Sequence, residues 1–163
     1  RPASGRISWH DESQPEPLPP AEVSHYLGHR NAMKPELTVA ENLVFWRDFL
    51  GNRPGGRHLS IADAAEAVEL SAILHLPFGY LSAGQQRRMA FAKLLVAHRP
   101  VWILDEPTAA LDIAAEALFS RLIREHLGLG GLVLAATHQP LDFEAHHRLE
   151  MKGFEFAGME DGA

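Results

Sequence analysis

Residues 81–112 read LSAGQQRRMAFAKLLVAHRPVWILDEPTAALD, and the order of features in this stretch decides the fold class. A turn of small residues opens a basic, amphipathic helix, and a proline ends it. A continuously apolar strand follows at residues 101–104, and two adjacent carboxylates, Asp105 and Glu106, come directly after it. Parallel strands that helices cover on both faces have this apolar character. The stretch therefore predicts an α/β protein with a parallel sheet.

The rest of the chain extends this pattern on both sides. We expect helices at residues 38–50, 60–74, 85–97 and 114–127, strands at 6–9, 23–27 and 132–136, a loop at 11–20, and terminal strands or a hairpin at 148–151 and 155–156. Thr38 with Glu41 forms the sequence pattern of a capping box, and Ser60 and Ser82 are the expected caps of the next two helices. We predict a helical subdomain at residues 33–80, between two parts of an α/β core at 1–32 and 81–163.

Composition excludes several classes of protein. The 163 residues carry a formal net charge of −6, which disfavours a nucleic-acid binder that relies on a broad basic face. No cysteine is present, so disulfides and thiolate metal sites are excluded. No apolar run reaches the ~20 residues that a membrane-spanning helix needs.

The two carboxylates suggest metal-assisted chemistry at the sheet edge. A buried strand delivers its last residues to the ligand crevice of an α/β sheet. One carboxylate can hold Mg²⁺, mostly through water, and the next can orient or deprotonate an attacking water. The alternative is a strand end with two solvated acids, and this motif by itself does not decide between them.

The turn at Leu81–Gln85 predicts an anion site, because exposed N–H groups and the positive helix end favour phosphate. The hydroxyl of Ser82 adds a donor. An ordinary helix cap is the alternative for this turn taken alone. The order of turn, helix, strand and carboxylates favours a protein that handles ATP, since a plain capped helix does not require it.

Four motifs together resemble those of ABC-type ATPases, in that family's order and spacing. LSAGQ at residues 81–85 resembles the signature motif, VWILDEP at 101–107 the Walker B motif, TAALD at 108–112 the D-loop and ATHQ at 136–139 the switch histidine. LTVAENL at 37–43 is similar to the start of the family's helical subdomain. The resemblance covers essentially the whole chain and implies a P-loop NTPase-like ABC ATPase core with a parallel sheet and a small helical subdomain.

A narrower resemblance is to the ATP-binding subunits of haem exporters that serve bacterial cytochrome c biogenesis. Its residues are YLGH at 26–29, KPELTVAENLVFW at 34–46, LSAGQQRR at 81–88 and THQPL at 137–141. Ala83, where most ABC proteins have glycine, fits that subfamily.

The family resemblance implies a role for each matching residue. Asp105 would help to hold Mg²⁺, Glu106 would be the general base, and His138 would contact the γ-phosphate and the attacking water. The residues expected to contact ATP held by a second subunit are Ser82, Gly84 and Gln85. Asp112 would couple the two subunits across their interface.

The same resemblance implies the surroundings of the protein. It implies ATP and Mg²⁺ as cofactors, a second ATP-binding subunit in a homodimer, and the integral membrane permease subunits of a haem exporter as partners. It implies a peripheral position on the cytoplasmic face of the bacterial inner membrane, and no nucleic acid as partner.

Two departures from the family pattern are present. The 163 residues contain no GxxxxGK[ST] phosphate loop, and Arg1–Trp9 resembles the segment that follows that loop and its helix. We therefore expect a fragment that lacks the phosphate-loop strand and helix and has weak or no ATP binding and ATPase activity alone. The glutamine of the family's Q-loop should fall near Arg30, and an arginine cannot accept a hydrogen bond.

Two other functions remain as alternatives. One is a non-transport ABC ATPase that acts on nucleic acid or ribosomes, which the acidic balance disfavours. The other is a non-catalytic, ABC-like interaction module, which the presence of Glu106 and His138 disfavours. The histidines at positions 25, 29, 146 and 147 could suggest haem ligands, but surface or packing roles explain them more simply.

Overall fold

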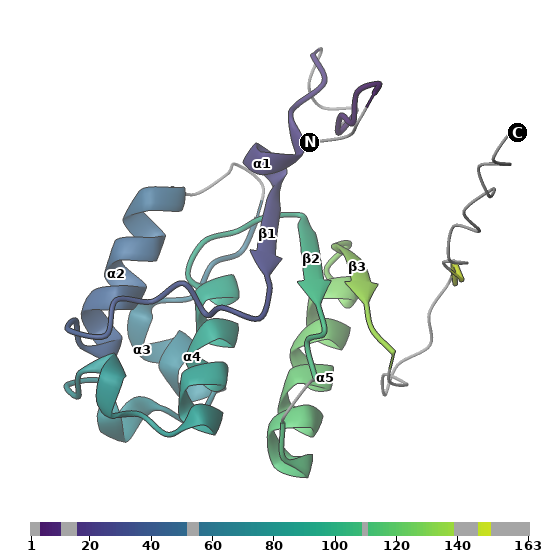
Figure 1. The fold of residues 1–163 in the computed structure, drawn as a ribbon. Coiled ribbons are helices and arrows are strands. Elements are labelled where there is room, and N and C mark those ends of the chain that lie inside the picture. The colour runs from purple at the N-terminus through teal and green to yellow at the C-terminus, as the bar shows by residue number, and fades with distance from the viewer. Residues whose placement is uncertain (1–3, 11–15, 52–55, 109–110, 139–146, 151–163) are drawn as a thin grey trace, which may run out of the picture.

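A parallel sheet of three strands forms the centre of the molecule in the computed structural model (Figure 1). The structure describes residues 4–10, 16–51, 56–108, 111–138 and 147–150. The strands are β1 (Ser24–Leu27), β2 (Val101–Asp105) and β3 (Leu132–Ala136), in the order β1-β2-β3. Both pairings are parallel, and Val101 faces Ser24 on one side and Leu132 on the other. The α/β class and the parallel sheet predicted from the sequence are confirmed.

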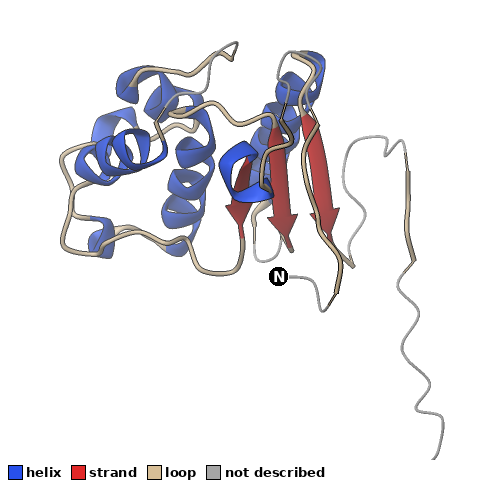
Figure 2. Cartoon of the chain, turned by 90° about the horizontal axis from the view of Figure 1, so that it is seen from above, coloured by secondary structure: helices blue, strands red, loops and turns tan. Residues whose placement is uncertain are grey.

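The helices lie in two places around this sheet (Figures 1 and 2). Helices α2 (Val39–Leu50), α3 (Ile61–Ala67) and α4 (Ala83–Leu95) pack against one another beside β1. Helix α5 (Ile113–Gly128) packs against β3 and also touches α4. Shorter elements are α1 (Pro20–Val23), η1 (Ser71–Ile73) and η2 (Phe78–Tyr80).

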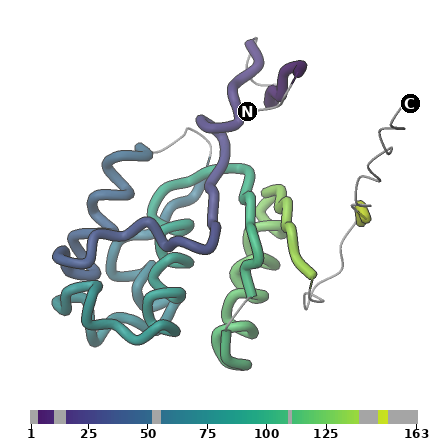
Figure 3. The backbone as a smooth tube through the Cα atoms, in the orientation of Figure 1, coloured from purple at the N-terminus to yellow at the C-terminus, as the bar shows by residue number. Residues whose placement is uncertain are grey.

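The chain path brings distant segments together (Figure 3). From β1 the chain passes through α2, α3 and α4 before it returns to β2, which pairs directly with β1. This long crossover is what parallel neighbours require. Residues 77 positions apart therefore lie side by side, as in the pair Tyr26 and Ile103.

The expected helix caps are present. Thr38 and Glu41 form a full capping box at the start of α2, in which the Thr38 hydroxyl accepts from the Glu41 N–H at 3.1 Å and the Glu41 carboxylate accepts from the Thr38 N–H at 2.8 Å. Ser60 caps α3 in the simpler way, through a 3.1 Å bond from the Asp63 N–H. These local bonds satisfy amide groups that have no partner within the helix.

The expectation of one helix over residues 60–74 is wrong, because α3 ends at Ala67. Glu69 adopts a left-handed backbone with φ of 60°. Its N–H bonds to the carbonyl of Glu66 at 2.9 Å, and the N–H of Leu70 bonds to the carbonyl of Ala65 at 2.8 Å. This pair of bonds is a Schellman motif, which terminates a helix. A non-glycine residue at its left-handed position gives no sequence signal of the stop.

Two expected terminal features are also corrected. Residues 6–9 do not form an edge strand, since only an isolated antiparallel bridge joins Trp9 to Leu18. Residues 148–150 are exposed and have no strand pairing. The remainder of the expected C-terminal hairpin, at 151 and 155–156, lies outside the described residues.

The core lies where α4 meets the sheet and the other helices. The rings of Phe91 in α4 and Phe119 in α5 stack with centroids 4.1 Å apart, and both side chains are fully buried. Leu27, Leu104 and Leu43 bring β1, β2 and α2 into the same cluster. Helix α4 is thus held on several sides, which fixes both its first turn and the residues that face the sheet.

Strand β3 differs from the other two strands in its exposure. It pairs with β2 on one side, and no described strand pairs with its other edge. Leu132 is 46% exposed and Leu134 is 62% exposed. One edge and one face of β3 are therefore uncovered in the described part of the chain. Within the described ranges, no helix combines the length and apolar character needed to cross a bilayer.

Candidate functional site

The two carboxylates lie where β2 ends, as the sequence predicts. Asp105 is the last residue of the strand and pairs in register with Ala136 of β3. Glu106 leaves the strand with a left-handed φ of 45°, and its N–H bonds to the carbonyl of Ala136 at 2.8 Å. The two adjacent carboxylates have different hydrogen-bond partners, which lie on β1 for Asp105 and after β3 for Glu106.

Glu106 and His138 are brought into contact by the pairing of β2 with β3. Nδ1 of His138 lies 2.9 Å from Oε1 of Glu106. A carboxylate only accepts hydrogen bonds, so Nδ1 is the protonated ring nitrogen in this arrangement. The second oxygen of Glu106, Oε2, is buried and has no hydrogen-bond partner among the described residues. A buried acceptor without a partner fits a ligand or water that donates to it.

Asp105 has a partner that the sequence did not suggest. The hydroxyl of Tyr26, on β1, donates to Oδ2 of Asp105 at 3.0 Å. This hydrogen bond raises the pKa of the Tyr26 phenol. The Tyr26 ring lies over Gly28, where an added Cβ would come within 2.7 Å of the tyrosine oxygen. A tyrosine at the end of an apolar strand carried no signal, because the neighbour of that strand was unknown.

The turn at the start of α4 has the geometry of a reciprocal helix cap. The Ser82 hydroxyl accepts from the Gln85 N–H at 3.3 Å, and the Gln85 side-chain oxygen accepts from the Ser82 N–H at 2.9 Å. The hydroxyl proton of Ser82 has no acceptor among the described residues and can donate elsewhere. A Cβ added at Gly84 would meet nothing within 4 Å, so packing inside the chain does not require glycine there.

The structure keeps the predicted residues in separate groups. Ser82, Gly84 and Gln85 make no hydrogen bond to Glu106 or His138, so no hydrogen bond joins the signature turn to the carboxylates among the described residues. Asp112 caps α5 by accepting from the Ala115 N–H at 2.7 Å. The neighbouring residues 109–110 lie outside the described residues.

The position expected for the Q-loop glutamine is exposed. Arg30 lies in a bend after β1 and makes no hydrogen bond or ion pair among the described residues. Within the described part of the chain, Arg30 therefore makes no hydrogen bond in place of the glutamine amide that the family has here. Ala32, two residues after Arg30, has a left-handed backbone with φ of 56°.

The histidines considered as haem ligands have ordinary surroundings where they are described. His25 is buried, and its Nε2 donates to the carbonyl of Ala97 at 2.7 Å. Burial lowers the pKa of His25 to about 3. His29 and His147 are exposed, and His146 lies outside the described residues. The described ranges hold no group of three or more His, Cys, Asp or Glu side chains that could bind a metal ion.

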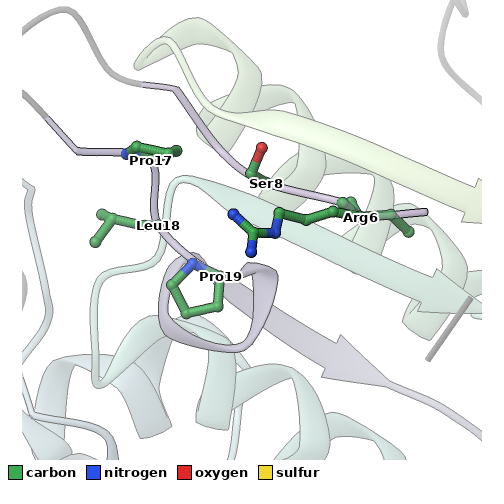
Figure 4. Close-up of a pocket in the computed structure, with 6 residues that line it drawn as sticks. Arg6, Ser8, Pro17, Leu18 and Pro19 are labelled. Atoms are coloured by element: carbon green, nitrogen blue, oxygen red, sulfur yellow. The ribbon is translucent and has the colours of Figure 1, made fainter.

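A small cavity lies near the N-terminus and is separate from these residues (Figure 4). Its lining comes from two short segments, residues 6–8 and 17–19, and the arginine side chain of Arg6 crosses it. None of the predicted site residues lines this cavity. The residues at the carboxyl end of β2 therefore remain the candidate site.

Comparison with known proteins agrees with the motifs. The sequence profile of the ABC transporter family matches residues 1–109. The chain is 65% identical over 162 residues to the cytochrome c biogenesis ATP-binding export protein CcmA of Rhizobium johnstonii, which covers 99% of this chain and 74% of that protein. The protein of the same name from Agrobacterium fabrum is 63% identical, with 100% of this chain and 76% of that protein covered.

A solved structure also resembles this fold. It is the dimeric, post-hydrolysis state of the ATP-binding cassette MJ0796 bound to ADP and Pi, with a TM-score of 0.60 and 25% sequence identity. The match covers 71% of this chain and 52% of that one, so the chain spans about half the length of that cassette. On the sequence profile, the curated relatives and the shared fold, this chain belongs to the ABC transporter family of ATP-binding proteins.

Proposed function

We propose that this chain is the ATP-binding subunit of an ABC exporter that moves haem for bacterial cytochrome c biogenesis. The observation that carries the proposal is the contact of Glu106 with His138 beside Asp105, at the carboxyl end of β2. The relatives named for cytochrome c biogenesis export support the transport process. The similar cassette that is bound to ADP and Pi supports a role in nucleotide chemistry.

The residues at the sheet edge fit ATP hydrolysis. Asp105 would hold Mg²⁺ through water, with Tyr26 orienting the carboxylate through its hydroxyl. Bound there, Mg²⁺ would neutralise charge on the phosphate oxygens. The partnerless Oε2 of Glu106 is the acceptor for the attacking water and takes its proton. His138 orients Glu106 through its Nδ1–H, and its Nε2 would donate to the γ-phosphate when that nitrogen also carries a proton.

The first turn of α4 would act on a different nucleotide. Ser82, Gly84 and Gln85 make no hydrogen bond to the carboxylates of their own chain among the described residues, which supports a role toward ATP held by a second subunit. The hydroxyl proton of Ser82 and the N–H groups of Ala83 and Gly84, which the reciprocal cap does not use, are donors for phosphate. Asp112, at the cap of α5, would couple the two subunits.

The proposed assembly is a homodimer of ATP-binding subunits on the membrane permease subunits of the exporter. The chain would dock to these subunits from the cytoplasmic face of the inner membrane, where ATP is available. Closure of the dimer on ATP and its opening after hydrolysis would move the permease. Co-purification of the chain with those permease subunits tests this part of the proposal, and a chain that fails to associate with them contradicts it.

A mixed dimer tests the role of the signature turn. The chain is combined with an intact ATP-binding subunit whose own signature serine is replaced, so that ATP held by that subunit depends on Ser82 of this chain. We expect steady-state ATPase activity above background with the wild-type chain and background activity with Ser82→Ala. Ser60→Ala is the matched control, because Ser60 caps α3 through the same type of bond.

The same assay separates the two groups of residues. Glu106→Gln in this chain should leave the mixed-dimer activity unchanged, because Glu106 would serve a nucleotide that its own subunit holds. Background activity with the wild-type chain would overturn the proposed role of the turn. Equal losses with Ser82→Ala and Ser60→Ala would show an effect on folding only.

A further inference from the structure

Arg87 is a buried cation on α4, the helix that begins in the signature motif and is called the signature helix below. The proposed mechanism gives Arg87 no role. It lies in the second turn of α4, five residues after Ser82, and is 9% exposed. Its neighbour Arg88 points elsewhere and pairs with the carboxylate of Glu69 at the end of α3. Two adjacent arginines therefore have different roles in the packing, and the buried one faces the sheet.

The guanidinium group of Arg87 bridges the ends of two strands. Nη1 donates to the carbonyl of Gly28, just after β1, at 2.8 Å, and lies 3.5 Å from Oδ1 of Asn31. Nη2 donates to the carbonyls of Pro107 at 3.2 Å and Glu106 at 3.4 Å, just after β2. The planar fork of arginine can reach two such groups at once, which a single ammonium cannot do equally well.

These contacts act on the backbone of the turn that carries Glu106. The carbonyl of Glu106 faces Arg87, while its N–H is bonded to the carbonyl of Ala136 on β3. Both backbone groups of this residue, which has a left-handed φ of 45°, are thereby bonded, the carbonyl to α4 and the N–H to the end of β3. A non-glycine residue adopts this conformation at a cost, and it persists where the surroundings determine it. The side chain is then directed toward His138.

We propose that Arg87 is a positioning residue that ties the signature helix to the Glu106 turn and to the segment after β1. Through this fork, a movement of α4 at its Ser82 end is transmitted to the carbonyls at the ends of β1 and β2. The role of the link in catalysis rests on the proposed function, but the link itself does not. Arg87 therefore couples, within one chain, the turn that faces a partner's nucleotide to the carboxylate that faces its own.

The test measures the turn directly in the 163-residue chain, without nucleotide. Amide hydrogen exchange is followed by NMR for wild type, Arg87→Gln, Arg87→Lys and the matched control Arg88→Gln. The key reporter is the N–H of Glu106, with the central amide of β2, at Ile103, as internal reference. The ¹⁵N shifts of the His138 ring give a second readout, because they report whether Nδ1 carries the proton.

We expect exchange at Glu106 to be at least about tenfold faster in Arg87→Gln, with less than about twofold change at Ile103. The His138 ring should shift from the Nδ1–H form toward the Nε2–H form, since its contact with Glu106 is loosened. Arg87→Lys should be intermediate, because it keeps the charge but not the fork. Arg88→Gln should match the wild type at both reporters.

Three results would overturn the proposal. One is unchanged exchange at Glu106 in the folded Arg87 variants. Another is full recovery by Arg87→Lys, which would show that charge alone suffices. The third is a uniform rise at Glu106 and Ile103, which would reduce Arg87 to a general packing role. If Arg87→Gln does not fold, Arg87→Lys decides between these results. Failure of the mixed-dimer assay leaves this measurement valid, so the two proposals fail independently.

Discussion

At the scale of single residues, buried histidines make the stability of this chain sensitive to acid. The ring of His25 is 2% exposed, and burial lowers its pKa to about 3, against 6.5 for the exposed group. His126 is also buried, stacks on Trp102 with centroids 4.1 Å apart, and has a lowered pKa for the same main reason. Both rings are neutral in the folded state at neutral pH.

The direction of the pH effect of His25 follows from proton linkage. Between pH 6.5 and about 3 the unfolded chain binds a proton at His25 and the folded chain does not. The stability that the neutral ring contributes is therefore full above pH 6.5 and is lost as the pH falls toward 3. The slope from this one residue is about 1.4 kcal/mol per pH unit within that window.

We predict that His25→Gln makes the free energy of unfolding less steep between pH 6 and 4. Glutamine can still donate to the carbonyl of Ala97 but does not titrate. Urea unfolding at several pH values measures the slope, and His75→Gln, at an exposed position, is the control for the substitution itself. A slope equal to that of the wild type would contradict the assignment of acid sensitivity to His25.

The expected site residues show what residue-scale reasoning could achieve. The strand pattern placed Asp105 and Glu106 at the carboxyl end of a buried strand, and the structure has them there. The contacts of Glu106 with His138 and of Tyr26 with Asp105 join residues 32 and 79 positions apart. Local patterns extend over only a few residues, so they could not predict either contact. The roles assigned to these residues stay predictions.

At the scale of elements, the caps were predictable and one helix end was not. The hydroxyl groups of Thr38 and Ser82 accept from backbone amides three residues away, which a sequence pattern displays directly. The end of α3 depends on Glu69 in a left-handed conformation. Glycine usually takes that position, and its absence removed the signal.

The left-handed backbone of Glu69 leads to a prediction about α3. The left-handed conformation costs a non-glycine residue about 1–2 kcal/mol of stability, and glycine avoids this cost. Glycine also gives the unfolded chain more conformational freedom, which cancels part of the gain. Glu69→Gly also removes the ion pair with Arg88. In the Arg88→Gln background, where that pair is already absent, we expect Glu69→Gly to raise the free energy of unfolding by about 1 kcal/mol.

The wild-type background provides the comparison for this substitution. There, Glu69→Gly should stabilise the chain less, by the strength of the Glu69–Arg88 pair, which is about 0.2–1 kcal/mol for a surface pair. Urea unfolding of the four proteins of this double-mutant cycle gives both values. Destabilisation by Glu69→Gly in both backgrounds would contradict the prediction, because it would show that glycine does not relieve a conformational cost at this position.

At the scale of the whole molecule, the uncovered strand β3 predicts self-association. An unpaired strand edge with exposed apolar side chains can pair with another chain. Leu134 on β3 is 62% exposed, and no described strand pairs with the outer edge of β3. We expect the chain by itself to form concentration-dependent oligomers, measured by light scattering after size-exclusion chromatography.

Two substitutions of exposed leucines test this expectation. Leu134→Lys, which places a charge on β3, should increase the monomer fraction at a given concentration. Leu129→Lys should leave it unchanged, because Leu129 is 73% exposed but lies at the end of α5, outside the strand. Equal effects of the two substitutions would assign the association to general surface apolarity.

The sequence by itself determined the type and order of most elements, the helix caps, the placement of the carboxylates at a strand end and the family. These features follow from hydrophobic periodicity, capping side chains and motif spacing, all of which are local properties. Only the tertiary structure decided which strand ends are neighbours. The pairing of β2 with β1 and β3, held by the buried face of α4, brings Tyr26 to Asp105, His138 to Glu106 and Arg87 to the carbonyls between them. The physical reason is that burial of the common core fixes strand neighbours across long separations, which no local pattern encodes.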